Sequence, residues 1–186
     1  MLNLILVGFS YTGKSAVGRA ASARLQWPLV DTDELVAQRA GRTIQEIFAT
    51  QGESFFRELE KEAIYQACTR RDVVVSTGGG AVIEPHNRTV MANSGVVVCL
   101  EARAETILKR MKASQAARKD SAAVRPLLLA EDPLAQITSM KEHRQVYYAA
   151  CDWTVHTDYL RTDEVVAEVL RGFDTVRKAR EKVETP

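Results

Sequence analysis

The chain is poor in the features that mark several classes of protein. Only three of its 186 residues are cysteine, and Cys68, Cys99 and Cys151 are widely separated and form no C-x-x-C pair. This spacing argues against a disulfide scaffold or a zinc site, and we expect three free thiols in a cytoplasmic protein. No apolar run approaches membrane-spanning length, and Leu2–Val7 is too short for the core of a signal peptide. A net charge of +1 gives no reason to expect a nucleic acid or a membrane as partner.

The composition is that of an ordinary globular domain. Hydrophobic residues make up 46% and charged residues 26% of a chain whose length fits one domain. Short β-branched runs alternate with helical patterns, which is typical of βαβ units around a parallel sheet. Strands are predicted at Leu4–Val7, Leu29–Asp31, Val73–Ser76, Val96–Leu100 and Trp153–His156. Helices are predicted near Lys14–Leu25, Asp33–Ala40, Thr43–Thr50, Gly52–Cys68, Pro85–Ala92, Ala104–Met111, Leu134–Ala150 and Thr162–Leu170.

The segment Gly8–Ser15 carries the most specific motif of the chain. Its sequence G-F-S-Y-T-G-K-S matches G-x-x-x-x-G-K-[ST], the phosphate-binding loop (P-loop), and it lies between a predicted strand and a predicted helix. The glycines let successive backbone N–H groups point at phosphate oxygens. Lys14 supplies a positive charge for the β- and γ-phosphates, and the Ser15 hydroxyl is a ligand for Mg²⁺. The alternative is a chance glycine turn, which the agreement of motif, position and context disfavours.

Two acidic residues end the second predicted strand. Asp31 and Asp33 are two residues apart on an extended chain, so both carboxylates can face the phosphate site. One would hold Mg²⁺ and its water, and the other would accept a hydrogen bond from a substrate hydroxyl. The alternative, in which Thr32 or Asp33 only caps the next helix, stays open.

Three further patterns could bind an anion. Arg57 lies three residues before Glu60 on a predicted helix, so the glutamate can hold the guanidinium ready for a substrate carboxylate, although an exposed ion pair is the commoner result of this spacing. The run Gly78–Gly80 ends a buried strand and lets backbone amides approach a ligand; the alternative is a flexible turn. Arg144, on a later helix, is a second candidate for the carboxylate, and a solvated helix face is its alternative.

A small, polar, weakly periodic segment at residues 113–124 is typical of a mobile loop. Arg125 follows it directly before a proline and could swing onto the γ-phosphate. We therefore predict a lid at about residues 112–126 within a domain of residues 1–174. The charged segment 175–186 is expected to be a frayed helix or a linker.

Taken together, these motifs resemble those of the shikimate kinase family. The resemblance extends to about residue 170 and includes G-x-x-x-x-G-K-S at Gly8–Ser15, D-T-D at Asp31–Asp33, F-R-x-x-E at Phe56–Glu60, G-G-G at Gly78–Gly80, R-P-L at Arg125–Leu127 and R-x-x-Y at Arg144–Tyr147. The P-loop alone indicates NTP binding, whereas the ordered set is specific to this family. The resemblance implies an α/β fold of the P-loop NTPase type, with three layers, a five-stranded parallel sheet and a mobile lid.

The resemblance also implies a reaction and a set of residue roles. ATP would phosphorylate the 3-hydroxyl of shikimate to give shikimate 3-phosphate and ADP in aromatic amino-acid biosynthesis, and the enzyme would be a monomer. Catalysis is expected from Lys14, Asp33 and Arg125, with Asp33 as base. ATP would be bound by Tyr11, Thr12, Gly13, Lys14, Ser15, Ala16, Arg110 and Arg125, with Arg110 on the adenine. Shikimate would be bound by Asp33, Arg57, Gly78, Gly79, Gly80 and Arg144, and Mg²⁺ by Ser15 and Asp31.

The chain departs from the family pattern at three places. The family usually has glycine at the position of Tyr11, and we expect a tyrosine to be tolerated if its φ is negative and its ring faces solvent. The lid is a few residues longer than is common, so Arg118 and Lys119 compete with Arg125 as the charge that faces the phosphates. Residues 157–161, Thr-Asp-Tyr-Leu-Arg, stand where the family often has a second arginine beside the adenine.

Two other functions remain open on the sequence. A kinase of the same fold could act on gluconate or on a nucleoside monophosphate, but a nucleotide would call for groups that recognise a base. The substitution at Tyr11 also makes a catalytically inactive nucleotide-binding regulator conceivable. A panel of these substrates, and an assay of ADP release with Asp33→Asn, would separate the three functions.

Overall fold

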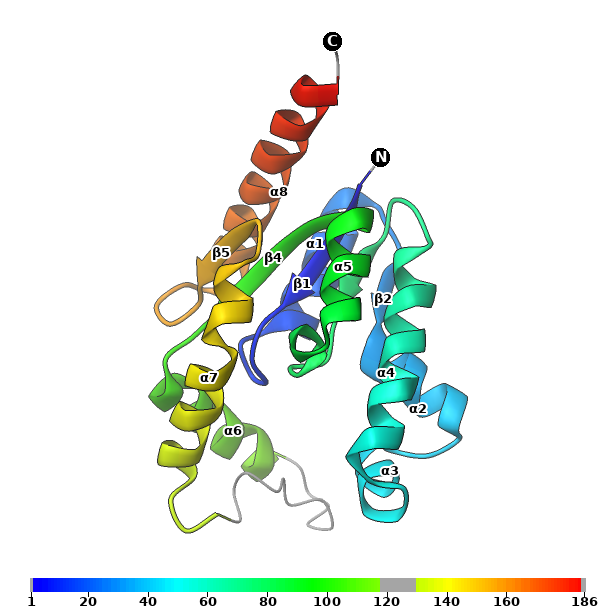
Figure 1. The fold of residues 1–186 in the computed structure, drawn as a ribbon. Helices are drawn as coiled ribbons and strands as arrows, with labels where there is room; N and C mark the ends of the chain where they lie inside the picture. The colour runs from blue at the N-terminus through cyan, green and yellow to red at the C-terminus, as the bar shows by residue number, and fades with distance from the viewer. Residues whose placement is uncertain (1, 118–129, 185–186) are drawn as a thin grey trace.

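A five-stranded parallel sheet forms the centre of the computed structural model, which describes residues 2–117 and 130–184 (Figure 1). The strands lie in the order β2-β3-β1-β4-β5. Their bounds are Asn3–Val7 for β1, Leu29–Asp31 for β2, Val74–Ser76 for β3, Gly95–Glu101 for β4 and Trp153–His156 for β5. The predicted fold class, with helices on both faces of a five-stranded parallel sheet, is confirmed. In the described ranges, no helix combines the length and apolar character needed to cross a membrane.

The central strand β1 shows why both faces of the sheet are covered. Its side chains alternate, so that Ile5 and Val7 enter one apolar cluster while Leu4 and Leu6 enter another. Helices α4 (Gly52–Cys68), α5 (Pro85–Ser94), α6 (Ala104–Ala117) and α7 (Pro133–Ala149) contribute to the first cluster. Helices α1 (Lys14–Leu25) and α8 (Thr162–Glu184) contribute to the second. The three central strands β1, β3 and β4 are buried on both faces and are therefore rich in apolar residues, whereas the edge strands β2 and β5 are only partly buried.

A third, smaller cluster joins α4 to α2 (Thr32–Ala40) and α3 (Ile44–Thr50). Val36, Ile47 and Phe56, one from each helix, are all buried in it. The α3 helix begins at a capping box, in which the side chains of Thr43 and Glu46 each accept a hydrogen bond from the other residue's backbone N–H. This cluster fixes the starts of α2 and α4, and those two helix starts carry Asp33 and Arg57.

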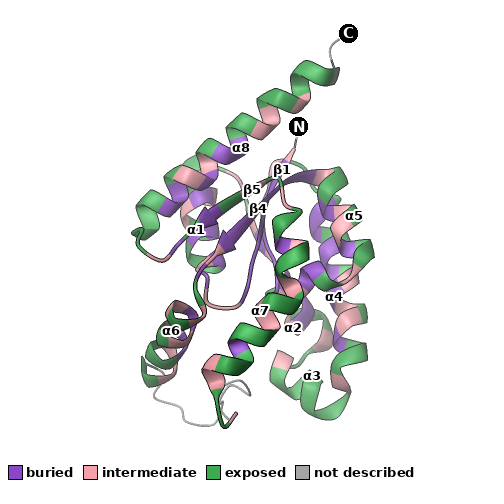
Figure 2. Ribbon diagram, turned by 60° about the vertical axis from the view of Figure 1, so that its left-hand side comes forward, coloured by how far each residue is buried: buried purple, intermediate pink, exposed green. Residues whose placement is uncertain are grey.

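Helix α8 is longer than the sequence pattern predicted. It continues to Glu184 instead of ending at Leu170, because Val176 packs against the second apolar cluster and Arg180 binds back to the domain. Arg180 donates to Asp152 Oδ1 at 2.6 Å and to the Gly95 carbonyl at 3.0 Å. Residues 175–184 are therefore part of a continuous helix, most of whose surface in this part is exposed (Figure 2). Helix α6 also extends beyond its predicted end, so residues 112–117 of the predicted lid are helical.

Candidate active site

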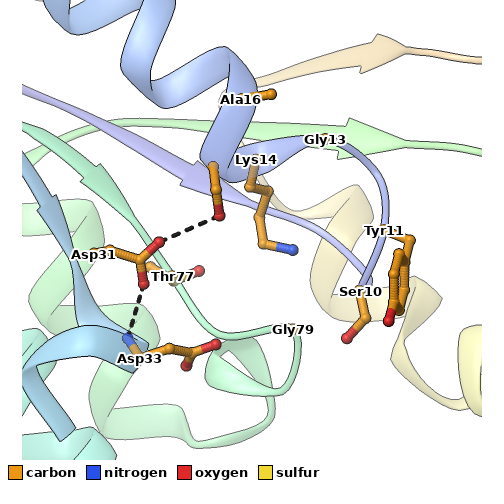
Figure 3. A pocket seen from close by; sticks show the side chains of 10 residues that line it. Ser10, Tyr11, Gly13, Lys14, Ala16, Asp31, Asp33, Thr77 and Gly79 are labelled. Carbon is orange, nitrogen blue, oxygen red and sulfur yellow. Dashed lines mark hydrogen bonds between the residues drawn. The ribbon is translucent and has the colours of Figure 1, made fainter. Parts of the chain in front are cut away.

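A cavity of about 280 Å³ opens where β1, β2 and β3 end (Figure 3). Its lining residues are Ser10, Tyr11, Gly13, Lys14, Ser15, Ala16, Asp31, Asp33, Thr77 and Gly79. All of them except Ser10 and Thr77 are among the site residues predicted from the sequence. Ser10 lies inside the P-loop, and Thr77 lies between the third strand and the glycine run. Both could therefore have been predicted from the sequence because they are next to motifs.

The backbone of the P-loop depends on Gly8. Its φ is +136°, and a Cβ placed there would lie 2.2 Å from the Leu100 carbonyl oxygen, so no side chain fits. Tyr11 also has a positive φ, 65°, and its ring packs against the first apolar cluster. The two conditions named for tolerating a tyrosine here, a negative φ and a ring facing solvent, are therefore not met. A left-handed conformation costs a non-glycine residue about 1–3 kcal/mol, and the packed ring and a hydrogen bond from Arg110 to the Tyr11 carbonyl at 3.2 Å help to offset it.

Lys14 is held in place by the backbone of its own loop. Its Nζ donates to the carbonyls of Gly8 and Phe9, both at 2.8 Å, and the residue is buried. Burial lowers the pKa of the Lys14 amine to about 8, against the nearby charges of Asp33 and Asp31, which act to raise it. The amine therefore carries a positive charge at neutral pH but holds its proton less tightly than an exposed lysine does.

The two acids of the D-T-D motif have different positions. Asp31 is the N-cap of α2 and accepts the Asp33 N–H at 3.0 Å through Oδ1. Its other oxygen, Oδ2, accepts from the Ser15 hydroxyl at 3.3 Å. The residue that caps α2 is thus Asp31, not Thr32 or Asp33 as the alternative had it, and Asp31 links the start of α2 to the start of α1 (Figure 3). Asp33 points from the first turn of α2 toward Gly79 in the same view.

Gly78 allows two carboxylates to approach the glycine run. A Cβ placed on it would lie 2.7 Å from Asp33 Oδ1 and 2.8 Å from Glu60 Oε1. Glu60 is 1% exposed, and its Oε1 is one of the few buried side-chain atoms without a hydrogen bond in the described part of the chain. Burial raises the pKa of the Glu60 carboxyl, although Arg57 lowers it. From the sequence, Glu60 was predicted only to hold Arg57 in place. The approach of its other oxygen, Oε1, to Gly78 was not predicted.

Arg57 lies against the last glycine of the run. Its guanidinium donates to Glu60 Oε2 at 2.6 Å and to Glu53 Oε1 at 2.8 Å, and a Cβ on Gly80 would lie 2.7 Å from its Nη1. Because Glu60 is buried, the alternative of a purely exposed ion pair does not hold. Arg57 is therefore pre-positioned on α4 beside the backbone of the glycine run.

Arg144 approaches the glycine run from the opposite side. Its Nη1 donates to the Gly79 carbonyl at 3.2 Å, and its guanidinium lies 5.3 Å from the centre of the Phe9 ring. The alternative of a solvated helix face is therefore wrong for Arg144. Tyr148, one turn later on α7, donates to the same carbonyl at 2.8 Å. The sequence motif drew attention to Tyr147, whereas the i,i+4 spacing on a helix would have indicated Tyr148.

Comparison with known proteins identifies the family of this chain. The family model described as shikimate kinase matches residues 11–173. This chain is 38% identical to a shikimate kinase of Caldanaerobacter subterraneus subsp. tengcongensis over 93% of this chain and 96% of that protein. It is 41% identical to one of Moorella thermoacetica over 90% and 91%. Among solved structures, the shikimate kinase from Acinetobacter baumannii in complex with shikimate superposes with a TM-score of 0.85 and 28% identity, over 95% of this chain and 94% of that one.

The chain belongs to the shikimate kinase family. In this family member, Arg110 donates to the Thr157 hydroxyl at 2.9 Å and to the Thr157 carbonyl at 2.6 Å, besides its bond to Tyr11. Arg110 thus connects the P-loop to the chain after β5. Arg161 is exposed, and its guanidinium pairs with the Asp163 carboxylate at 2.6 Å. Arg125, Arg118 and Lys119 lie outside the described residues.

The remaining predicted ATP ligands belong to the loop itself. The Thr12 hydroxyl donates to the Phe9 carbonyl at 2.9 Å and supports the turn from inside. Gly13 is the N-cap of α1, with φ 104°. Their backbone N–H groups therefore lie at the positive end of the α1 dipole, which is suited to an anion.

Proposed function

We propose that this chain transfers the γ-phosphoryl group of ATP to the 3-hydroxyl of shikimate, the reaction of its family. The observation that carries the proposal is the arrangement around one cavity: Lys14 on one side, Asp33 across from it, and Gly79 beside both. Behind Gly79, Arg57 and Arg144 approach the glycine run from two helices. A cation for phosphates, an acceptor for a hydroxyl and cations for a carboxylate are what this pair of substrates needs.

Asp33 is proposed as the base for the reacting hydroxyl. As the 3-oxygen bonds to the γ-phosphorus, the bond from that phosphorus to the bridging oxygen of ADP breaks, and the hydroxyl proton passes to the Asp33 carboxylate. Lys14 balances the charge on the phosphate oxygens, which phosphoryl transfer requires more than covalent help. Arg125 is proposed to add a second cation there.

The carboxylate of shikimate is proposed to bind at the other end of the glycine run. Arg57 and Arg144 would each offer N–H donors to it, and the backbone N–H of Gly79 would add a third. The substrate hydroxyl is thereby bound by a carboxylate of the protein, and the substrate carboxylate by guanidinium groups. Shikimate therefore has one orientation in which its 3-hydroxyl faces Asp33.

Mg²⁺ fits the residues present. The Ser15 hydroxyl and the Asp31 carboxylate are hard oxygen donors 3.3 Å apart beside the P-loop. Across residues 2–117 and 130–184 there is no cluster of three or more metal-binding side chains, and Mg²⁺ in kinases takes most of its ligands from phosphates and water. When bound, the ion neutralises charge on the β- and γ-phosphates. Ser15 and Asp31 would hold it.

We further propose that the enzyme acts as a monomer in the cytoplasm. Cys68, Cys99 and Cys151 are free thiols, which agrees with a reducing compartment. Sedimentation at several protein concentrations would test the oligomeric state.

The function is tested by coupling ADP release to a spectroscopic assay with shikimate, gluconate and nucleoside monophosphates as acceptors. We expect turnover with shikimate alone. Asp33→Asn should lose most of that rate, about 10²–10⁴-fold for removal of a general base. Glu34→Gln, an exposed acid on the same helix, is the matched control and should retain it. No ADP release with shikimate, or an equal loss in both variants, would refute the proposal.

A further inference from the structure

The carbonyl oxygen of Gly79 is where α7 meets the glycine run. It accepts a hydrogen bond from the Tyr148 hydroxyl at 2.8 Å and another from Arg144 Nη1 at 3.2 Å. The two donors are four residues apart and therefore lie on one face of the helix. Tyr148 is 3% exposed, and burial raises the pKa of its phenol, so its hydroxyl stays protonated and remains a donor.

The two donors are not equivalent once a substrate binds. Arg144 is also a proposed carboxylate ligand, so its guanidinium would be shared between the Gly79 carbonyl and the substrate. The Tyr148 ring is enclosed in the first apolar cluster, which leaves its hydroxyl little freedom to turn elsewhere. Tyr148 can therefore keep its bond to Gly79 throughout.

Holding the Gly79 carbonyl has a consequence for the next amide. The carbonyl of Gly79 and the N–H of Gly80 belong to one planar peptide unit and point in opposite directions. Within the described residues, the N–H groups of Gly79 and Gly80 form no hydrogen bond. Arg57 lies directly against Gly80. Glycine residues rotate easily because they lack a Cβ atom, so a bond to the Gly79 carbonyl helps to keep the Gly80 N–H in one direction.

We propose that Tyr148 is a positioning residue for the acid end of the substrate. Its hydroxyl fixes the Gly79 carbonyl, so that the Gly80 N–H and the Arg57 guanidinium form one anion site whose backbone does not depend on Arg144. The proposal rests on the proposed function only for the identity of the substrate.

The test compares Tyr148→Phe with Tyr147→Phe. Both variants lose one hydroxyl from neighbouring residues, but the Tyr147 ring packs under Arg88, and in the described part of the chain the side-chain donors to the Gly79 carbonyl are Arg144 and Tyr148. Tyr148→Phe should raise the KM for shikimate about tenfold, the effect of one lost hydrogen bond, with the KM for ATP unchanged. Tyr147→Phe should change neither KM. An unchanged shikimate KM in Tyr148→Phe, or an equal decline of kcat and of the affinities for both substrates, would overturn the proposal.

Two further measurements separate a missing donor from a disturbed fold. 4-Aminophenylalanine at position 148 retains a donor and should keep the shikimate KM close to that of the wild type, whereas 4-fluorophenylalanine fills the position without a donor and should raise it. This pair decides the question even if Tyr148→Phe does not fold. If both analogues give the same KM, the proposal is wrong.

The second measurement is independent of activity. In protein labelled with ¹⁵N-glycine, which has 10 glycines in all, Tyr148→Phe should shift the amide resonances of Gly79 and Gly80, and Tyr147→Phe should leave them in place. If the wild type fails to phosphorylate shikimate, the proposed function falls, while these resonances still decide whether Tyr148 orients the glycine run. Unmoved resonances in Tyr148→Phe would overturn the inference.

Discussion

The proposed phosphate side and the proposed acid side of the site are built in different ways. The phosphate side is one continuous segment, Gly8–Ser15, whose lysine binds carbonyls of its own loop. The acid side is assembled from parts far apart in the chain: Arg57 on α4, the glycine run after β3 and Arg144 on α7. The first is a local backbone structure. The second depends on the packing of three elements around it.

The charges of the two sides also differ. Lys14 is a single buried amine whose pKa of about 8 lies close to neutral pH. Arg57 is held by two carboxylates of the protein, Glu53 and Glu60, and a guanidinium stays protonated at any pH of interest. Binding of ATP at the phosphate side should therefore depend on pH. Binding of shikimate at the acid side should depend on the positions of its hydrogen-bond donors. The five predictions below test this comparison.

The largest effect is expected from Gly8→Ala. The new Cβ would lie 2.2 Å from a backbone oxygen at a φ of +136°, and neither can move without opening β4 or the P-loop. We expect a loss of roughly 3 kcal/mol or more in the free energy of unfolding, measured by urea denaturation. Gly41→Ala is the control, because its φ of +61° is also positive but no atom lies within 4 Å of the added Cβ. Equal losses in both would show that steric contact with β4 does not matter.

Lys14→Met should reduce kcat by about 10³-fold, because one preorganised donor to the transferring phosphoryl group is lost. The affinity for shikimate, measured by calorimetry without nucleotide, should be unchanged, since the acid side does not include Lys14. Lys109→Met, an exposed lysine on α6, should behave as the wild type in both measurements. A large loss of shikimate affinity in Lys14→Met would show that the two sides are not independent.

Arg57→Lys should raise the KM for shikimate roughly 30-fold, which corresponds to about 2 kcal/mol for losing a charged, two-pronged hydrogen-bond donor. The KM for ATP should remain that of the wild type. Arg39→Lys removes a guanidinium from an exposed ion pair with Glu62 and should have no kinetic effect. If charge alone is sufficient on the acid side, Arg57→Lys will match the wild type, and the role of geometry there is refuted.

ATP affinity should decline as the pH rises through about 8, where the Lys14 amine loses its proton. In the free protein the pKa of Lys14 is about 8, and bound phosphates stabilise the charged amine and raise that pKa. Binding above pH 8 therefore takes up a proton, and the affinity should be about tenfold weaker at pH 9 than at pH 7. Calorimetry in two buffers of different ionisation enthalpy measures this proton uptake. Shikimate binding should show no such proton uptake. An equal uptake of protons on binding of both ligands would contradict the comparison.

The smallest effect is expected far from both sides, at Arg180 on α8. Arg180→Ala removes the bonds to Asp152 and to the Gly95 carbonyl and should cost about 1 kcal/mol of unfolding free energy with no change in kcat or KM. Lys178→Ala, an exposed neighbour on the same helix, should cost nothing measurable. A change in kcat for Arg180→Ala would mean that the end of α8 affects the site.

Much of the architecture could be predicted because it depends on local patterns. The β-branched runs predicted all five strands to within two residues, and the motif order led to the family that the comparisons confirm. The predicted ends of α6 and α8 were wrong, since both helices continue past their strongest apolar pattern. In α8 the continuation depends on Arg180 reaching Asp152, a contact between residues distant in sequence.

The sequence alone determined the P-loop, because a run of eight residues with two glycines contains within itself the backbone path and the lysine that the path encloses. It could not determine the conformation of Tyr11, which depends on the ring packing against the first apolar cluster and on Arg110. Only the tertiary structure decided that Glu60 turns an unpaired oxygen toward Gly78 and that Tyr148, rather than its neighbour, binds Gly79. Those contacts join residues from different helices and loops, and burial and hydrogen bonding select them only after the sheet has brought these elements together.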